Sequence, residues 1–119
     1  MRVMGIDPGS NRTGYGIIET SGNELKPIYW GAVQTHPKEA FYRRLKVIYD
    51  SLIDVIREYA PDTVAVEDLF FAVNAKSALK LGQTRGVILL TAAKENIPIA
   101  EKLADKINAQ IGSSRPVVD

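Results

Sequence analysis

Residues 1–15 read MRVMGIDPGSNRTGY, which is an apolar run, a turn and the start of a second apolar run. The run from Arg2 to Ile6 is short, and the turn after it begins at Asp7, so the pattern predicts a strand that ends at a carboxylate. Thr13 to Glu19 and Leu25 to Val33 have the composition of two further strands. Three successive strands joined by short turns predict an antiparallel meander.

The segment from Glu39 to Tyr59 changes to a helical period. Apolar residues recur there every three or four positions, and this spacing predicts an amphipathic helix. Four cations are expected off the apolar stripe, namely Arg43, Arg44, Lys46 and Arg57. The residues Ala60-Pro61-Asp62 end this helix, because the position before a proline disfavours helical backbone.

The second half of the chain continues with a strand and a helix. Thr63 to Val66 predicts a buried strand that ends at Glu67, and Asn74 is suited to cap a helix over about residues 75–95. The later half of that helix is apolar nearly all round, so something must cover it. Further elements are predicted after it, a short fifth strand over 97–100 and a third helix over 103–111.

These elements predict one α/β domain over residues 1–112, with a mixed five-stranded sheet flanked by helices and a tail over 113–119. Hydrophobic residues make up 45% of the 119 residues and charged residues 24%, as in ordinary globular proteins. The net charge is only +1, so any nucleic-acid surface must come from local clusters of cations. The absence of cysteine excludes disulfides and thiolate metal sites. Without a signal peptide or a long apolar run, we expect a cytoplasmic protein with no membrane partner.

Asp7 and Glu67 are the first candidates for chemistry, since each ends a predicted apolar strand. If these strands are adjacent, the two carboxylates repel each other, and a divalent cation would relieve the repulsion and orient a phosphate. We therefore interpret both residues as catalytic and metal-binding. The alternative interpretations are that Asp7 caps the turn before Pro8 and Gly9, and that Glu67 is a surface charge at a strand terminus.

Candidate DNA contacts flank the two carboxylates. Phe70 is suited to stack on unpaired bases while Phe71 packs inward, and the alternative is that one or both simply cap the core. Lys76 and Lys80 share a helix face, which suits phosphate contacts or simply a solvated face. The full set of candidate DNA-binding residues is Phe70, Asn11, Arg12, Asn74, Lys76, Lys80 and Arg85.

Two separated motifs carry a resemblance to a known family. Residues 1–15 closely resemble the opening of the RuvC crossover-junction endonucleases, and VEDLFFA at 66–72 with SALKLGQTRG at 77–86 is a more specific match. The resemblance extends to about Pro98. It implies a ribonuclease H-like fold and a homodimer that nicks four-way DNA (Holliday) junctions in recombination and repair, using Mg²⁺ with Mn²⁺ as a substitute.

The resemblance also implies roles for single residues and partners. The family's first catalytic aspartate and its catalytic glutamate match Asp7 and Glu67, and its junction-probing phenylalanine matches Phe70. The helix around Ser77 to Ala93 resembles the family's dimer interface. Branch-migration helicases are partners by the same analogy.

The sequence departs from the family pattern at several places. Val73 stands where the family usually has lysine, and beyond Pro98 the match fades, with Asn108 where lysine is usual. The family's glycine-rich stretch and its final helix with two aspartates have no counterpart. We therefore expect a shortened chain with an incomplete C-terminal helix. Weak or absent cleavage is expected as well, because two carboxylates compensate the charge of two cations poorly.

Two other classes of function remain open. Sugar kinases and actin-like ATPases share this kind of core and also open with a strand, an aspartate and a glycine turn, but such phosphotransferases need a second domain. Measuring ATP binding distinguishes that class. A non-catalytic module that binds branched DNA or another protein is the second alternative, and junction binding in chelator without nicking in magnesium would favour it.

Overall fold

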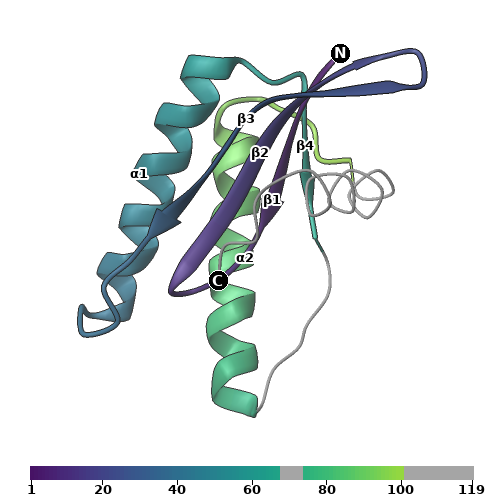
Figure 1. Cartoon of the computed structure of the whole chain (residues 1–119). Helices are drawn as coiled ribbons and strands as arrows, with labels where there is room; N and C mark the ends of the chain where they lie inside the picture. Colours follow the sequence, from purple (N-terminus) through teal and green to yellow (C-terminus); the bar gives the residue numbers. More distant parts are fainter. Residues whose placement is uncertain (68–73, 101–119) are drawn as a thin grey trace.

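The computed structural model describes residues 1–67 and 74–100, and Figure 1 shows their arrangement. The elements in chain order are β1 (Arg2–Asp7), β2 (Arg12–Ser21), β3 (Glu24–Gln34), α1 (Phe41–Tyr59), β4 (Thr63–Val66) and α2 (Ala75–Lys94). The strands form one sheet in the order β3-β2-β1-β4. Neighbours in the β1–β2–β3 meander run antiparallel, whereas β4 runs parallel to β1. The predicted meander and mixed sheet are therefore confirmed.

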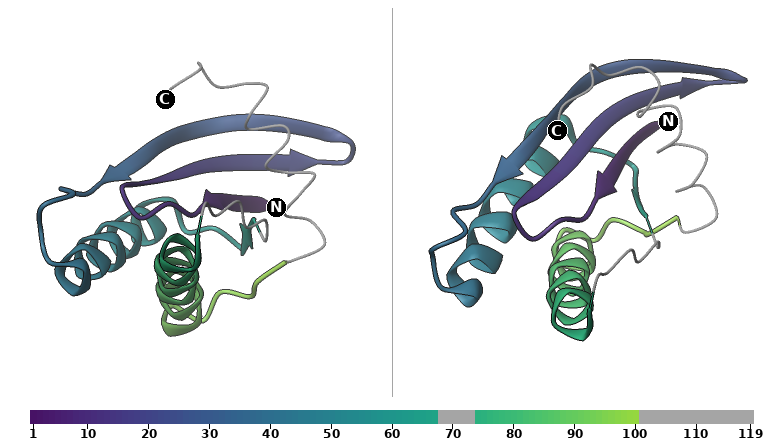
Figure 2. Two further views of the ribbon diagram at one scale, coloured as in Figure 1. Left: turned by 90° about the horizontal axis from the view of Figure 1, so that it is seen from below. Right: turned by 60° about the horizontal axis from the view of Figure 1, so that its bottom comes forward.

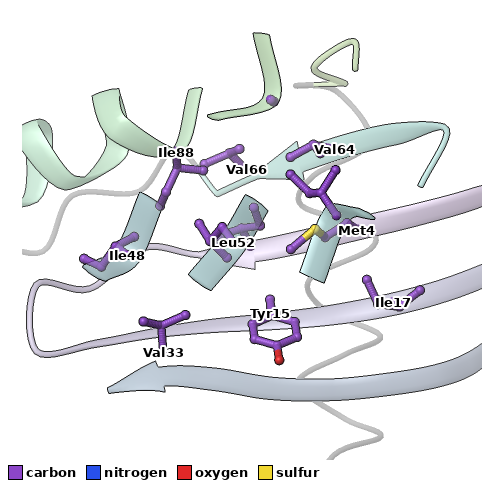
Figure 3. Packing of buried hydrophobic residues seen from close by; sticks show 12 residues of the cluster. Met4, Tyr15, Ile17, Val33, Ile48, Leu52, Val64, Val66 and Ile88 are labelled. Carbon is purple, nitrogen blue, oxygen red and sulfur yellow. The ribbon is translucent and has the colours of Figure 1, made fainter. Parts of the chain in front are cut away.

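Both helices cover the same face of the sheet, as Figure 2 shows. Side chains alternate between the two faces along a strand, so Met4 and Ile6 of β1 lie on the helix side and Val3 lies on the other. The main core fills the space between sheet and helices, with Ile48 and Leu52 from α1 and with Ile88 from α2 (Figure 3). A smaller cluster on the other face joins Val3, Ile18 and Ala65.

The sheet has four strands, so the prediction of a fifth strand over residues 97–100 is wrong within the described part of the chain. This segment makes one isolated parallel bridge, between Val64 and Ile99. The Val64 amide donates to the Pro98 carbonyl oxygen at 3.0 Å, and the Ala100 amide donates to the Val64 carbonyl oxygen at 2.9 Å. Pro98 has no N–H with which to extend a ladder, which limits the pairing.

The second helix begins where the sequence predicts. The side-chain oxygen of Asn74 accepts a hydrogen bond from the Ser77 amide at 2.9 Å, so the predicted cap is confirmed. Within residues 1–67 and 74–100, neither helix has the length and apolar character needed to cross a bilayer. The predicted third helix over 103–111 and the tail lie outside the described residues.

One predicted feature of the first helix is wrong. Arg43, Lys46 and Arg57 are exposed as expected, but Arg44 is buried, with 4% of its surface exposed. Arg44 precedes the core residue Ile48 by four positions, so it lies in phase with the apolar stripe and not off it. A cation in this position needs polar partners inside the protein.

Candidate active site

Asp7 ends β1, and Glu67 follows β4 directly. The parallel register pairs Ile6 with Val66, and the Glu67 amide donates to the Ile6 carbonyl oxygen at 3.2 Å. Asp7 and Glu67 are the residues directly after this last pair, where neighbouring backbones of a sheet lie about 4.8 Å apart. Because Ile6 and Val66 belong to the core beneath the helices, alternation places both carboxylates on the opposite face of the sheet.

The chemistry of these two side chains fits a divalent cation. Asp7 is exposed and Glu67 is half-buried. Two negative charges at neighbouring positions repel each other, and a cation offsets that repulsion. Magnesium is usually held by one or two carboxylates together with substrate phosphates, so the pair fits one such ion. Residues 1–67 and 74–100 contain no group of three or more histidine, cysteine, aspartate or glutamate side chains arranged to hold a metal.

The turn after Asp7 has a shape that requires glycine. A Cβ atom at Gly9 would lie 2.1 Å from the Arg12 carbonyl oxygen, which no other residue can accept. The hydroxyl of Thr13, which is fully buried, donates to the Gly9 carbonyl oxygen at 2.8 Å. The backbone beside Asp7 is thus fixed, as a carboxylate that orients a metal requires.

Arg44 and Thr35 hold the other side of this turn, and sequence reasoning missed both of them. Arg44 donates from Nη2 to the Ser10 carbonyl oxygen at 2.8 Å and to the side-chain oxygen of Asn11. Thr35, directly after β3, donates from its hydroxyl to the same Ser10 oxygen at 2.7 Å. The phase of Arg44 with Ile48 was the one sequence signal for its burial.

The predicted DNA contacts near the turn occupy different environments. Asn11 is exposed, and its side-chain oxygen is engaged by Arg44. Arg12 is half-buried at the start of β2. Asn74 uses its side-chain oxygen to cap α2. Phe70 lies outside the described residues, so its predicted role in probing the junction stays a prediction.

The predicted cations of α2 do not all lie on one side of the helix. Lys76 is exposed and Lys80 is half-buried, and they share a face because four residues separate them. The Lys80 ammonium lies 5.7 Å from the centre of the Phe41 ring, which connects this face to the start of α1. Arg85 follows Lys80 by five positions, about 140° around the helix, so it lies away from that face.

An apolar strip runs along the outer side of α2. Leu79 and Leu90 are 62% and 60% exposed, and three helical turns separate them, so both lie on one side. Gly82 and Gly86 lie between them and have open space where a Cβ would be. We call Leu79, Gly82, Gly86 and Leu90 the α2 strip. The sequence predicted a need for cover in the later half of this helix, and the strip shares Leu90 with that half.

The family model and the curated relatives that match this chain carry the same family name. The family model "Crossover junction endodeoxyribonuclease RuvC" matches residues 3–115. A protein of that name from Desulforamulus reducens is 48% identical over 101 residues, which are 85% of this chain and 62% of that protein. Its counterpart from Geobacter sulfurreducens is 48% identical over 111 residues, which are 93% of this chain and 68% of that protein. The chain thus spans about two thirds of the length of these curated relatives.

Solved structures show the same similarity in three dimensions. RuvC of Thermus thermophilus in complex with a Holliday junction substrate has a TM-score of 0.78 at 29% identity, covering 85% of this chain and 65% of that chain. Another Thermus thermophilus RuvC structure has a TM-score of 0.74 at 32% identity, covering 85% of this chain and 63% of that one. The predicted ribonuclease H-like fold is confirmed by these matches.

Proposed function

Because this chain belongs to the RuvC family of crossover junction endodeoxyribonucleases, we propose that it acts on four-way DNA junctions, with Asp7 and Glu67 in its active site. The observation that carries the proposal is the parallel register of β1 and β4, whose last pair, Ile6 and Val66, directly precedes the two carboxylates. The Holliday junction bound by the Thermus thermophilus relative supports the choice of substrate. Membership of this family also disfavours the phosphotransferase alternative.

Asp7 and Glu67 are the residues that would hold the divalent cation, with Mg²⁺ as the expected ion and Mn²⁺ as a substitute. Such a cation, when bound, polarises the scissile phosphate and lowers the pKa of a bound water. The two carboxylates fix where the phosphate sits, because each is attached to the end of a strand in one rigid sheet.

Lys76 and Lys80 are the proposed contacts to the phosphate backbone of a junction arm. The Phe41 ring lies 5.7 Å from the Lys80 ammonium and 5.3 Å from the Arg44 guanidinium. Arg44 in turn bonds the turn beside Asp7, so this chain of contacts links the Lys80 charge to the carboxylate site. Arg12, Asn11, Asn74, Arg85 and Phe70 remain further candidates.

We also propose that two copies of the chain pair through the α2 strip. A strip with Leu79 and Leu90 more than half exposed is a poor surface to leave in water, and a two-fold pair would cover it with its own copy. Gly82 and Gly86 would let two helices approach closely, because neither carries a side chain. A pair would carry two sites in one particle, which suits the nicking of two strands.

A cleavage assay on a synthetic four-way junction tests the proposed activity. We expect the chain to bind the junction more tightly than a duplex of the same sequence and to nick it slowly, because the described residues supply two carboxylates. Asp7→Asn and Glu67→Gln should each lower nicking roughly 100-fold while junction binding persists, since an amide is a poorer ligand for a hard cation than a carboxylate.

The matched control for this assay is Asp54→Asn, which removes an exposed carboxylate from α1 and should leave nicking unchanged. Both Mg²⁺ and Mn²⁺ are tested, with enzyme in excess over junction. Nicking that survives in Asp7→Asn and Glu67→Gln would contradict the proposed site. Junction binding in chelator with no nicking in either metal would favour the non-catalytic module instead.

A further inference from the structure

We propose that Arg44 is a positioning residue that locks the turn of residues 8–11, and with it Asp7, against α1 and β3. The inference rests on the proposed function, because it assigns Arg44 a task at the same site. The hydrogen bonds of the Arg44 guanidinium go to other residues of the protein, so we assign it a structural task and no contact with substrate.

The burial of the Arg44 guanidinium explains why it forms hydrogen bonds to the turn. Its surface is 4% exposed, so the guanidinium has lost most of its hydration and must be satisfied by hydrogen bonds within the protein. It donates to Thr35 Oγ1 at 3.3 Å, to the Ser10 carbonyl oxygen at 2.8 Å and to Asn11 Oδ1. These three acceptors are neutral, so the arrangement is a set of hydrogen bonds to a charged donor and not an ion pair.

If position 44 only had to stabilise the fold, an apolar side chain would be sufficient there. Replacing a buried charged group by a hydrophobic residue of similar volume is often neutral or stabilising. What such a residue cannot do at position 44 is hold Ser10 and Asn11, which belong to the turn that follows Asp7. The partners of Arg44 therefore point to control of the turn.

Buried polar residues donate hydrogen bonds to three successive carbonyl oxygens of the turn. Thr13 donates to the Gly9 carbonyl oxygen at 2.8 Å, and Thr35 and Arg44 both donate to the Ser10 carbonyl oxygen. The Thr35 amide donates to the Asn11 carbonyl oxygen at 2.9 Å. Thr13, Thr35 and Arg44 are 0%, 5% and 4% exposed. Three successive carbonyl dipoles thus have partners inside the protein, so none of them needs to face a phosphate bound beside Asp7.

Arginine suits this task better than lysine. Its planar guanidinium has five N–H donors in a fixed fork, so one side chain reaches oxygens of both the turn and Thr35. Lysine offers a single ammonium at the end of a flexible stem. Arg44→Lys is therefore an informative conservative variant, because it keeps the charge and loses the fork.

The test compares Arg44→Met, Arg44→Lys and the control Arg43→Met, whose side chain is 63% exposed on the same helix. Amide hydrogen exchange of residues 8–13, relative to that of the core strands, reports whether the turn opens locally. Titration with Mn²⁺ alone reports the metal site. We expect Arg44→Met to speed exchange in the turn about 10- to 100-fold and to weaken Mn²⁺ binding about 10-fold.

Arg44→Lys should fall between Arg44→Met and the natural chain in both measurements, and it keeps the test usable if Arg44→Met does not fold. Arg43→Met should change neither. Asp7→Asn should abolish Mn²⁺ binding without opening the turn, which separates loss of a ligand from loss of its support.

Two results would overturn the role of Arg44. If the Arg44 variants speed amide hydrogen exchange equally in the turn and in the core strands, Arg44 stabilises the whole fold and does not hold the turn specifically. A turn that opens while Mn²⁺ affinity stays the same would show that the lock does not serve the site. A natural chain that binds no Mn²⁺ would overturn the proposed metal site instead, and the exchange measurement alone would then decide whether Arg44 holds the turn.

Discussion

Tyr15 illustrates how one buried side chain constrains its neighbours. The residue is 8% exposed, and its ring lies 6.2 Å from the ring of Tyr29, measured between centroids. Gly31 is its register partner on β3, and a Cβ there would lie 2.7 Å from the Tyr15 hydroxyl oxygen, so a larger residue would displace the ring. Burial, which disfavours the phenolate, is the main reason why the pKa of Tyr15 is raised to about 12.

This shift predicts a step near pH 12 in an alkaline absorbance titration, which belongs to Tyr15. A tyrosine with a pKa of 10.0 when unfolded and about 12 when folded stabilises the fold fully below pH 10. That contribution is lost as the pH rises toward 12, because the unfolded chain releases the proton more readily. Tyr15→Phe should remove this last, high-pH step of the titration. A last step that survives in Tyr15→Phe would contradict the assignment.

The elements were predictable from the sequence wherever one segment carries its own pattern. The apolar run before Asp7, the helical period after residue 40 and the cap at Asn74 each specify an element locally, and the structure places all three within a few residues of the prediction. The fifth strand failed because its pairing depends on Val64 and on the missing N–H of Pro98. The burial of Arg44 had one local signal, its phase with Ile48, but its polar partners could not be predicted because they come from distant segments of the chain.

The end of α1 offers a prediction at the scale of an element. Ala60 caps this helix in the left-handed region, with φ 46° and ψ 59°, and its amide donates to the Ile56 carbonyl oxygen at 2.8 Å. A residue with a Cβ is strained there, whereas glycine is not. We expect Ala60→Gly to raise the free energy of unfolding by about 0.5–1 kcal/mol in urea denaturation, after the entropic cost of glycine in the unfolded chain.

The comparison for this variant is Asn96→Gly. Asn96 also has a positive φ, 58°, but asparagine tolerates the left-handed region better than alanine does. Its replacement should therefore gain less stability than that of Ala60. Equal gains at the two positions, or a loss at Ala60, would contradict backbone strain as the cause.

At the scale of the molecule, the candidate site depends on a contact that no local pattern contains. The sequence predicts that Asp7 and Glu67 end strands, but their adjacency requires β4 to pair in parallel with β1, next to the meander and not elsewhere. The two helices both cover one face of the sheet (Figure 2). Alternation along β1 directs Asp7 to the other face, whereas the α2 strip lies on the exposed side of α2. The proposed cutting site and the proposed pairing surface are therefore separate, and a variant of one should spare the other.

This separation can be tested with Leu90→Lys. A lysine at one end of the α2 strip would place an ammonium group of each copy in an apolar contact, which opposes pairing. One chain has a mass of 13.1 kDa. We expect the natural chain to sediment as a dimer with twice this mass, and Leu90→Lys to sediment as a monomer. Val47→Lys is the control, because Val47 is 42% exposed on α1 and lies outside the strip.

A monomeric natural chain, or an equal effect of Val47→Lys, would contradict pairing through the α2 strip. Nicking gives a second measurement that does not depend on mass. Each site would still hold Asp7 and Glu67 in the monomer, so single nicks in a four-way junction should persist in Leu90→Lys. We expect paired nicks in one junction to need two sites in one particle, so the fraction of junctions cut on both strands should fall.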